Sequence, residues 1–153
     1  DSKVHALDAE TGEPRWEFQR EPRTWWRWDL PTGRWFWGQP VIMGQTLYIG
    51  SLDAHVYALD AATGQKRWEY PVIGPVRAGP AYEDGVLFVG TDKGYLYAID
   101  VNTQQERWSF KAEHSILAKP ATSGDTVFVG TTKGALIALN AATGAERWRF
   151  PQE

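Results

Sequence analysis

The sequence predicts an all-β fold, a β-propeller built from four-stranded antiparallel blades. One phrase of eleven residues occurs four times, and its last three copies begin at Ala58, Ala98 and Ala138, a constant spacing of 40 residues. Between the copies, short runs rich in Val, Tyr, Phe and Leu alternate with turn pairs such as Asp-Gly and Lys-Gly. No stretch has sustained helical apolar spacing, so we expect almost no helix. A four-stranded unit that recurs at about 40 residues is typical of a propeller blade.

The third repeat shows how each blade is expected to be built. Its innermost strand is predicted at 76–82, the second at 86–90, the third at 95–100 and the fourth at 106–110. The Asp-Gly and Lys-Gly pairs between these runs supply the positive φ that tight hairpin turns need. The same register divides the whole chain, which we expect to form one partial propeller over residues 1–153, into blade 1 at 1–18 (outer strands only), an insert at 19–34, blade 2 at 35–70, blade 3 at 75–110 and blade 4 at 115–150.

Two residue types mark equivalent points of blades 2, 3 and 4. A proline falls within each predicted innermost strand, where it is tolerable because that strand presents one edge to the central channel rather than to a partner. A glycine closes each second strand. These residues are Pro40, Pro80 and Pro120, and Gly50, Gly90 and Gly130.

The predicted strands do not complete a ring. The chain opens at the turn before a third strand, which gives 14 strands, or about three and a half blades. Propellers have roughly four to eight blades, so closure needs more than this chain supplies. Two explanations stay open. The chain is part of a larger ring, which we favour, or another copy or a partner covers its open blade ends, which would otherwise promote aggregation.

The repeated phrase predicts a tight turn and a tryptophan that packs between neighbouring blades. We expect its Asp and Thr-Gly to hydrogen-bond the tight turn between the third and fourth strands. Its final tryptophan is large and flat, suited to packing between neighbouring blades. We expect each of these tryptophans to be deeply buried, with the last one contributing least because it lies near an open end. The four blade-docking residues are Trp16, Trp68, Trp108 and Trp148.

These phrases resemble the tryptophan-docking motif of quinoprotein dehydrogenases and their pyrroloquinoline-quinone-like propeller relatives, with the pattern A-x-D-x-x-T-G-x-x-x-W. The resemblance covers nearly all of the chain except residues 19–34. Two copies depart from it, with Asn140 at the Asp position and Gln104 at the Gly position. In that family the motif is architectural, so it implies the fold without implying the quinone. The family's vicinal cysteine pair has no counterpart here, because the chain has no cysteine, and its calcium ligands and catalytic base cannot be matched.

One segment breaks the period and is the predicted contact site. The motif tryptophan and the next strand proline are 24 residues apart in the first repeat and 12 apart in the later ones. Five of the nine tryptophans, with several arginines, lie at residues 20–37, in the insert and directly after it. Two interpretations stay open: an aromatic hairpin that packs as a lid, or a surface that recognises a protein, a peptide or a small molecule. In an extended strand Trp26 and Trp28 would share one face and Trp25 and Arg27 the other. The candidate residues are Trp25, Trp26, Arg27, Trp28, Arg34, Trp35 and Trp37.

Composition and motifs exclude several classes of protein. The net charge of −3 argues against a generally basic nucleic-acid binder, and no apolar run approaches the ~18 residues of a membrane span. The three histidines occupy unrelated places in the repeat, so no metal site is predicted. No nucleotide-binding loop or nucleophile elbow occurs, and we predict no catalytic residue and no cofactor.

The sequence therefore favours a non-catalytic propeller scaffold, similar to the lipoprotein propellers that assist assembly of bacterial outer-membrane proteins. By that resemblance we expect a periplasmic or otherwise exported protein. Its predicted partner is another protein chain or the missing part of the propeller, with homo-oligomers through the open blade ends as a further option. The alternative is a fragment of a quinone-dependent alcohol or sugar dehydrogenase whose active residues lie outside this chain.

Overall fold

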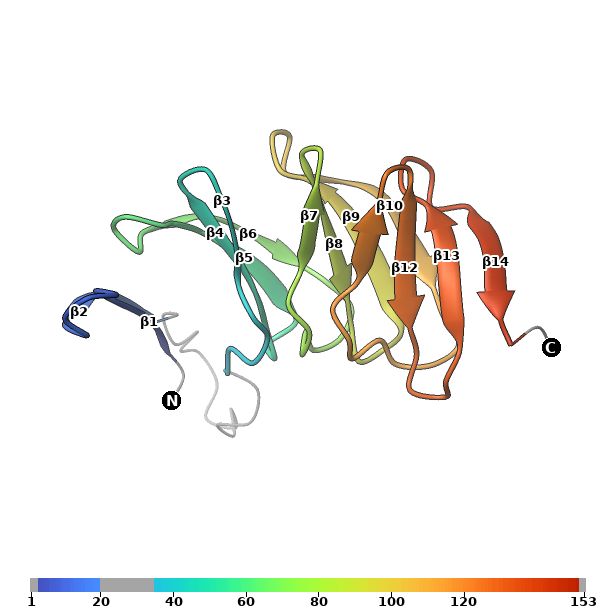
Figure 1. The fold of residues 1–153 in the computed structure, drawn as a ribbon, viewed down its shortest axis with the longest axis horizontal. Helices are drawn as coiled ribbons and strands as arrows, with labels where there is room; N and C mark the ends of the chain where they lie inside the picture. Colours follow the sequence, from blue (N-terminus) through green and yellow to red (C-terminus); the bar gives the residue numbers. More distant parts are fainter. Residues whose placement is uncertain (1–2, 20–34, 152–153) are drawn as a thin grey trace, which may run out of the picture.

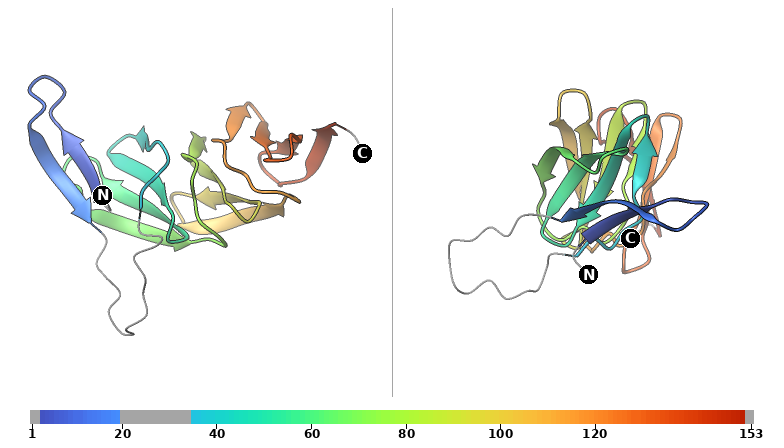
Figure 2. Two further views of the ribbon diagram at one scale, coloured as in Figure 1. Left: turned by 90° about the horizontal axis from the view of Figure 1, so that it is seen from below. Right: turned by 90° about the vertical axis from the view of Figure 1, so that its left-hand side faces the viewer.

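The computed structural model describes residues 3–19 and 35–151 and confirms the all-β prediction. Within these ranges the chain forms fourteen strands and no helix. One two-stranded and three four-stranded antiparallel sheets follow one another along an open arc, from the N-terminal pair to the C-terminal sheet (Figures 1 and 2). The described chain thus contains about three and a half blades.

Each full blade is a meander in which consecutive strands pair, from a short inner strand to a longer outer one. Blade 1 is β1 (Lys3–Leu7) and β2 (Pro14–Gln19). Blade 2 is β3 (Val41–Met43), β4 (Thr46–Ser51), β5 (His55–Asp60) and β6 (Lys66–Pro71). Blade 3 is β7 (Ala81–Glu83), β8 (Val86–Gly90), β9 (Tyr95–Asp100) and β10 (Gln105–Lys111). Blade 4 is β11 (Ala121–Ser123), β12 (Thr126–Gly130), β13 (Leu136–Asn140) and β14 (Glu146–Phe150).

The innermost strands are shorter than the sequence predicts. β7 begins one residue after Pro80 and contains only three residues. The predicted start at Val76 is wrong, because that residue donates its backbone N–H to Ser51 of the preceding blade at 3.0 Å. The carbonyl of Pro75 meanwhile accepts from the Asp92 backbone N–H at 2.9 Å. The segment before the recurring proline therefore ties two blades together, and the sheet starts only after it.

The recurring glycines leave room for the next blade. A Cβ on Gly50 would lie 2.2 Å from Cγ1 of Val76, and one on Gly90 would lie 2.3 Å from Cγ2 of Ile116. Such contacts are far below van der Waals distance, so the following blade's branched side chain takes the space of the missing Cβ. Gly130 stands at the equivalent point of blade 4, where nothing lies within 4 Å of an added Cβ.

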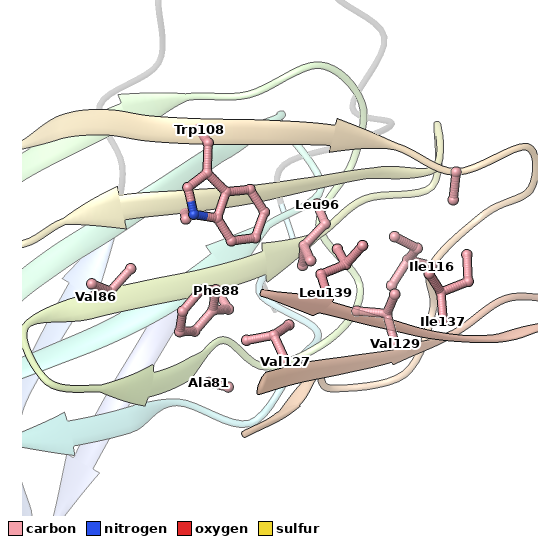
Figure 3. Close-up of a cluster of buried hydrophobic side chains, with 12 residues drawn as sticks. Ala81, Val86, Phe88, Leu96, Trp108, Ile116, Val127, Val129, Ile137 and Leu139 are labelled. Carbon is pink, nitrogen blue, oxygen red and sulfur yellow. The ribbon is translucent and has the colours of Figure 1, made fainter. Parts of the chain in front are cut away.

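The apolar core lies between the blades. Three clusters of buried side chains coincide with the three blade interfaces. In the interface of blades 3 and 4, Phe88 and Trp108 pack with Val127 and Leu139 of the next sheet (Figure 3). Full burial of one such side chain stabilises the fold by ~1.5–3 kcal/mol. Each blade therefore depends on its neighbour for most of its apolar burial.

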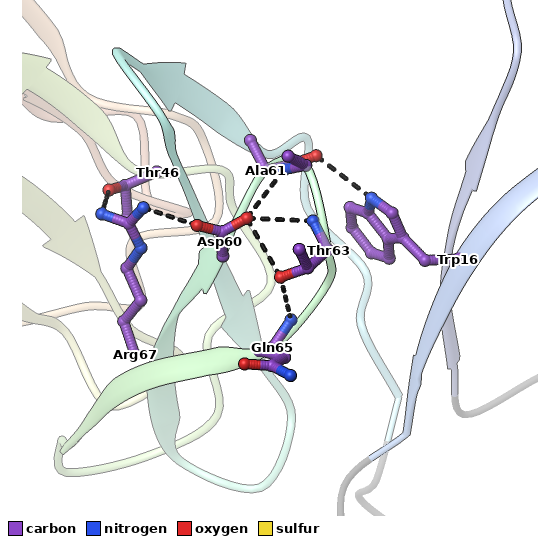
Figure 4. A network of polar contacts seen from close by, with 8 residues as sticks. Trp16, Thr46, Asp60, Ala61, Thr63, Gln65 and Arg67 are labelled. Atoms are coloured by element: carbon purple, nitrogen blue, oxygen red, sulfur yellow. Dashed lines mark hydrogen bonds and ion pairs between the residues drawn. The ribbon is translucent and has the colours of Figure 1, made fainter.

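The aspartate of the repeated phrase holds the turn after the third strand, as predicted. In blade 2, Oδ1 of Asp60 accepts the backbone N–H groups of Ala62 at 3.0 Å and Thr63 at 2.9 Å (Figure 4). Its Oδ2 accepts from Nη2 of Arg67 at 2.6 Å. One carboxylate thus joins the turn to the first residues of the outer strand.

The same turn geometry recurs in two other copies and lowers the pKa of its aspartates. The hydrogen bonds hold the pKa of Asp8, Asp60 and Asp100 at about 2, below the ordinary 3.8. For Asp60 the largest cause is the side chain of Arg67, and for the other two it is a backbone N–H of the turn.

The fourth copy of the repeated phrase keeps the hydrogen bonds of the turn, but its arginine forms an ion pair with a different carboxylate. Oδ1 of Asn140 accepts the backbone N–H groups of Ala142 at 2.9 Å and Thr143 at 3.0 Å. An amide carries no charge, and Arg147 pairs instead with the carboxylate of Asp125, with Nη1 3.0 Å from Oδ1. The substitution therefore preserves the backbone bonds, while a neighbouring hairpin supplies the missing charge.

Candidate binding surface at Trp35 and Trp37

The structure describes two of the seven residues predicted to form the contact site. Trp35 and Trp37 lie in the segment that precedes β3, beside the interface between blades 1 and 2. The other five lie outside the described residues: Trp25, Trp26, Arg27, Trp28 and Arg34.

Trp35 and Trp37 flank Phe36 in an extended segment fastened to blade 2. The Trp35 carbonyl accepts from the Leu52 backbone N–H at 3.0 Å, and Phe36 forms an isolated antiparallel bridge with Ser51. Side chains alternate along extended chain, so Phe36 packs inward while both tryptophans point outward. Trp35 is 48% exposed and Trp37 is 61% exposed. The arrangement presents two large aromatic side chains on a backbone that is already ordered.

Phe36 is the anchor of this segment, and the sequence analysis missed it. Its ring centroid lies 6.0 Å from that of Phe18 and 5.6 Å from that of Tyr57, with an edge-on angle to the latter. Phe36 occupies the position that Val76 and Ile116 hold in the later repeats. The register of the repeat contained this signal, because an apolar residue recurs four positions before each strand proline.

A buried polar group lies beneath the anchor. The Tyr57 hydroxyl donates to Oδ2 of Asp53 at 2.8 Å, and Nδ1 of His55 lies 3.0 Å from the Asp53 carbonyl oxygen. The Asp53 side chain is only 7% exposed. These bonds fix the Tyr57 ring on which Phe36 packs. No sequence motif marked this group, since its three members lie in the turn and strand that follow β4.

Two of the motif tryptophans hydrogen-bond to the next blade. Nε1 of Trp16 donates to the Ala61 carbonyl at 3.1 Å (Figure 4), and Nε1 of Trp108 donates to the Ala141 carbonyl at 2.9 Å. Each ring covers the motif glycine of that turn, where a Cβ would come within 2.5 Å of Trp16 and 2.7 Å of Trp108. The repeated phrase thus supplies both the tryptophan of one blade and the glycine turn that the preceding blade's tryptophan covers.

The other two motif tryptophans are placed differently. In the third copy, Gln104 has a φ of 59° at the position where the other copies have glycine. The indole of Trp68 makes no hydrogen bond to a described residue. Trp68 is half-buried and packs on Tyr48, with ring centroids 5.7 Å apart. The expectation that every motif tryptophan is deeply buried is met only by Trp108, which is 9% exposed. Trp16 and Trp68 are half-buried, and Trp148 is 41% exposed. In the described structure no blade lies against Trp148.

Two features of the described residues, 3–19 and 35–151, bear on function. No group of three or more His, Cys, Asp or Glu side chains in them is arranged to hold a metal ion. No helix in them is long and apolar enough to cross a membrane.

Comparisons with solved structures give the same fold. BamB from Moraxella catarrhalis matches with a TM-score of 0.78 and 24% identity, over 97% of this chain and 46% of that chain. Quinohemoprotein alcohol dehydrogenase ADHIIG from Pseudomonas putida HK5 matches with a TM-score of 0.68 and 30% identity, over 74% of this chain and 20% of that chain. The quinohemoprotein alcohol dehydrogenase from Comamonas testosteroni matches with a TM-score of 0.75 and 18% identity, over 97% and 32%.

The chain thus spans less than half the length of each of these structures. No curated protein matches it. A family model described as outer membrane protein assembly factor BamB matches residues 1–153, the whole sequence. The repeat, the blade geometry and this match agree, and the chain belongs to the BamB family of pyrroloquinoline-quinone-like β-propellers.

Proposed function

We propose that the chain is a non-catalytic propeller scaffold that binds other proteins, with Trp35 and Trp37 in its contact site. The observation that carries this proposal is the pair of exposed tryptophans on either side of the packed Phe36. Tryptophan dominates binding hot spots because it offers a large contact area at a low cost in conformational entropy. The family description, an outer membrane protein assembly factor, supports outer-membrane proteins as the class of partner and the periplasm as the location.

Binding to an unfolded outer-membrane β-barrel protein, fluorescently labelled and diluted from urea, tests this proposal. The Trp35→Ala, Trp37→Ala double variant is expected to weaken binding by on the order of tenfold or more, measured by fluorescence anisotropy. The matched control is Ile42→Ala, Met43→Ala, which removes two other exposed apolar side chains at the opposite edge of blade 2. Equal losses in both variants, or no loss in the first, would reject the tryptophan site.

A fragment of a quinone-dependent alcohol dehydrogenase is the second candidate, favoured by the 30% identity to the Pseudomonas putida enzyme over 74% of this chain. The chain has no cysteine for the pair that the resemblance implies over the quinone. We therefore expect pyrroloquinoline quinone with Ca²⁺ to leave the protein's absorbance spectrum and melting temperature unchanged. Saturable binding at micromolar quinone would favour the enzyme over the scaffold.

A further inference from the structure

A pocket of about 340 Å³ opens between blades 3 and 4, far from the tryptophan pair, at the edge where the hairpin turns lie. Buried Val86 and Phe88 of β8, together with Ala141, form an apolar floor. Glu83 and Asp84 stand on its rim, at the β7–β8 turn. The volume lies at the low end of the range of ~300–1,000 Å³ that is usual for ligand pockets.

Two residues in the interface between blades 3 and 4 depart from the repeat. Between blades 2 and 3 the ring of Tyr82 stacks on that of Tyr48, with centroids 6.2 Å apart and planes 15° apart. In the next interface Phe88 takes the place of Tyr48, but Thr122 takes the place of Tyr82. Ala142 likewise replaces a longer asparagine of the previous turn. The pocket lies in this same interface, and Ala142 is one of its lining residues.

The charges around the pocket do not cancel. Arg107 already pairs with the aspartate of its own turn, through Nε at 2.9 Å and Nη2 at 2.6 Å. Asp125 already pairs with Arg147, whose guanidinium lowers the pKa of that carboxyl group. Glu83 and Asp84 have no side-chain hydrogen bond or ion pair with any described residue. Two uncompensated negative charges therefore lie beside an apolar floor.

We propose that this pocket binds an alkylammonium group, the side chain of a lysine in a bound polypeptide. The ammonium group is attracted by the carboxylates of Glu83 and Asp84, and the four-carbon stem lies along the pocket wall at Ala141 and Ala142. An organic cation fits better than a metal ion, because no described trio of ligand side chains is present here. The site is separate from the Trp35 and Trp37 surface, so either can fail without the other.

Titration of the ¹⁵N-labelled chain with acetyl-Gly-Lys-Gly-amide tests the proposal. Saturable shifts are expected for the backbone amides of Gly124, Ala141 and Ala142, with no response to the same peptide acetylated at its Nε atom. The Glu83→Gln, Asp84→Asn double variant is expected to weaken binding at least tenfold, and Ala142→Asn to weaken it by narrowing the pocket. Glu10→Gln, a change of an exposed carboxylate in blade 1, is the control and leaves binding unchanged.

The variants are chosen to fold. Asp84 has a φ of 46°, a conformation that asparagine adopts readily, and Ala142→Asn recreates the residue that blade 3 carries at the same point. Equal binding of the acetylated peptide would overturn the role of charge. Tighter binding of 1,5-diaminopentane than of the peptide would overturn the polypeptide as the source. Absence of shifts at 10 mM peptide, on the order of the weakest specific binding, would overturn the site itself.

Discussion

At the scale of single residues, the motif aspartate carries two separable sets of hydrogen bonds. One oxygen of Asp100 accepts backbone N–H groups of the turn, and the other accepts from Arg107. Asn140 shows that an amide keeps the first set and gives up the second. We therefore expect Asp100→Asn to lower the melting temperature less than Asp100→Ala, measured by circular dichroism. Equal losses would mean that the turn bonds contribute nothing beyond the ion pair.

The same aspartates make stability depend on pH. Their pKa is about 2 in the folded protein, below the ordinary 3.8, so the folded state favours the charged form. Their contribution is therefore fully present above about pH 5 and is lost as the pH falls toward 2. Melting temperatures measured from pH 7 to pH 2 are expected to fall in this window. Asp60→Asn and Asp100→Asn together are expected to flatten that fall, and an unchanged slope would contradict the assignment.

Sequence reasoning found the aspartate and missed its partners. The turn was predictable because Asp, Thr and Gly stand at fixed offsets, and the chemistry of such turns is local. The ion pair of Arg147 with Asp125 was not predictable, because it joins residues 22 positions apart on different hairpins. The repeat register marked Phe36 as an apolar position, but not its packing on blade 1 and β5, which joins residues far apart in sequence.

At the scale of elements, the second strand of each blade is shaped by the blade that follows. Gly90→Ala would drive a methyl group into Ile116, where the distance to Cγ2 is 2.3 Å, and is expected to destabilise the fold by about 1–3 kcal/mol. Gly130→Ala is the matched control, because nothing lies within 4 Å of its added Cβ. There the lower backbone entropy of alanine is expected to be neutral or to stabilise by up to about 1 kcal/mol. Denaturant melts measure both, and equal effects would contradict the packing argument.

The contribution of each outer-strand tryptophan to stability depends on how much of its ring is buried. Trp108→Ala removes a ring that is 9% exposed and is expected to cost about 3–5 kcal/mol of unfolding free energy. Trp148→Ala removes one that is 41% exposed and is expected to cost clearly less. Urea titrations of the two variants provide the measurement. Equal, small losses would reject the wedge role of the motif.

Strand positions were predicted well where the pattern is local and poorly where it is not. The strands at 86–90 and 95–100 match the prediction residue for residue, because alternating apolar runs and glycine turns bound them on both sides. The innermost strands came out too long, since residues around Val76 have strand-like composition but hydrogen-bond to the previous blade. Composition alone does not reveal which partner an extended segment chooses.

At the scale of the whole molecule, the two ends of the arc carry matching halves of one contact. Blade 4 offers an uncovered Trp148, and blade 1 offers the turn at Gly12, where nothing lies within 4 Å of an added Cβ. Inside the arc such a tryptophan covers such a glycine. We therefore predict concentration-dependent association of this chain, detectable by sedimentation velocity and weakened by Trp148→Ala. A single species with an unchanged sedimentation coefficient across a hundredfold dilution series would contradict this prediction.

The placement of the core between sheets has a consequence for how such a chain can grow or shrink. A blade cut out alone would expose both of its apolar faces, so a single blade is not expected to be stable by itself. Added or lost repeats change the molecule in steps of one interface, each with its own hydrophobic cluster. Duplication of a blade can therefore lengthen the arc without redesigning what is already there. It also means that unfolding can begin at either end while the middle persists.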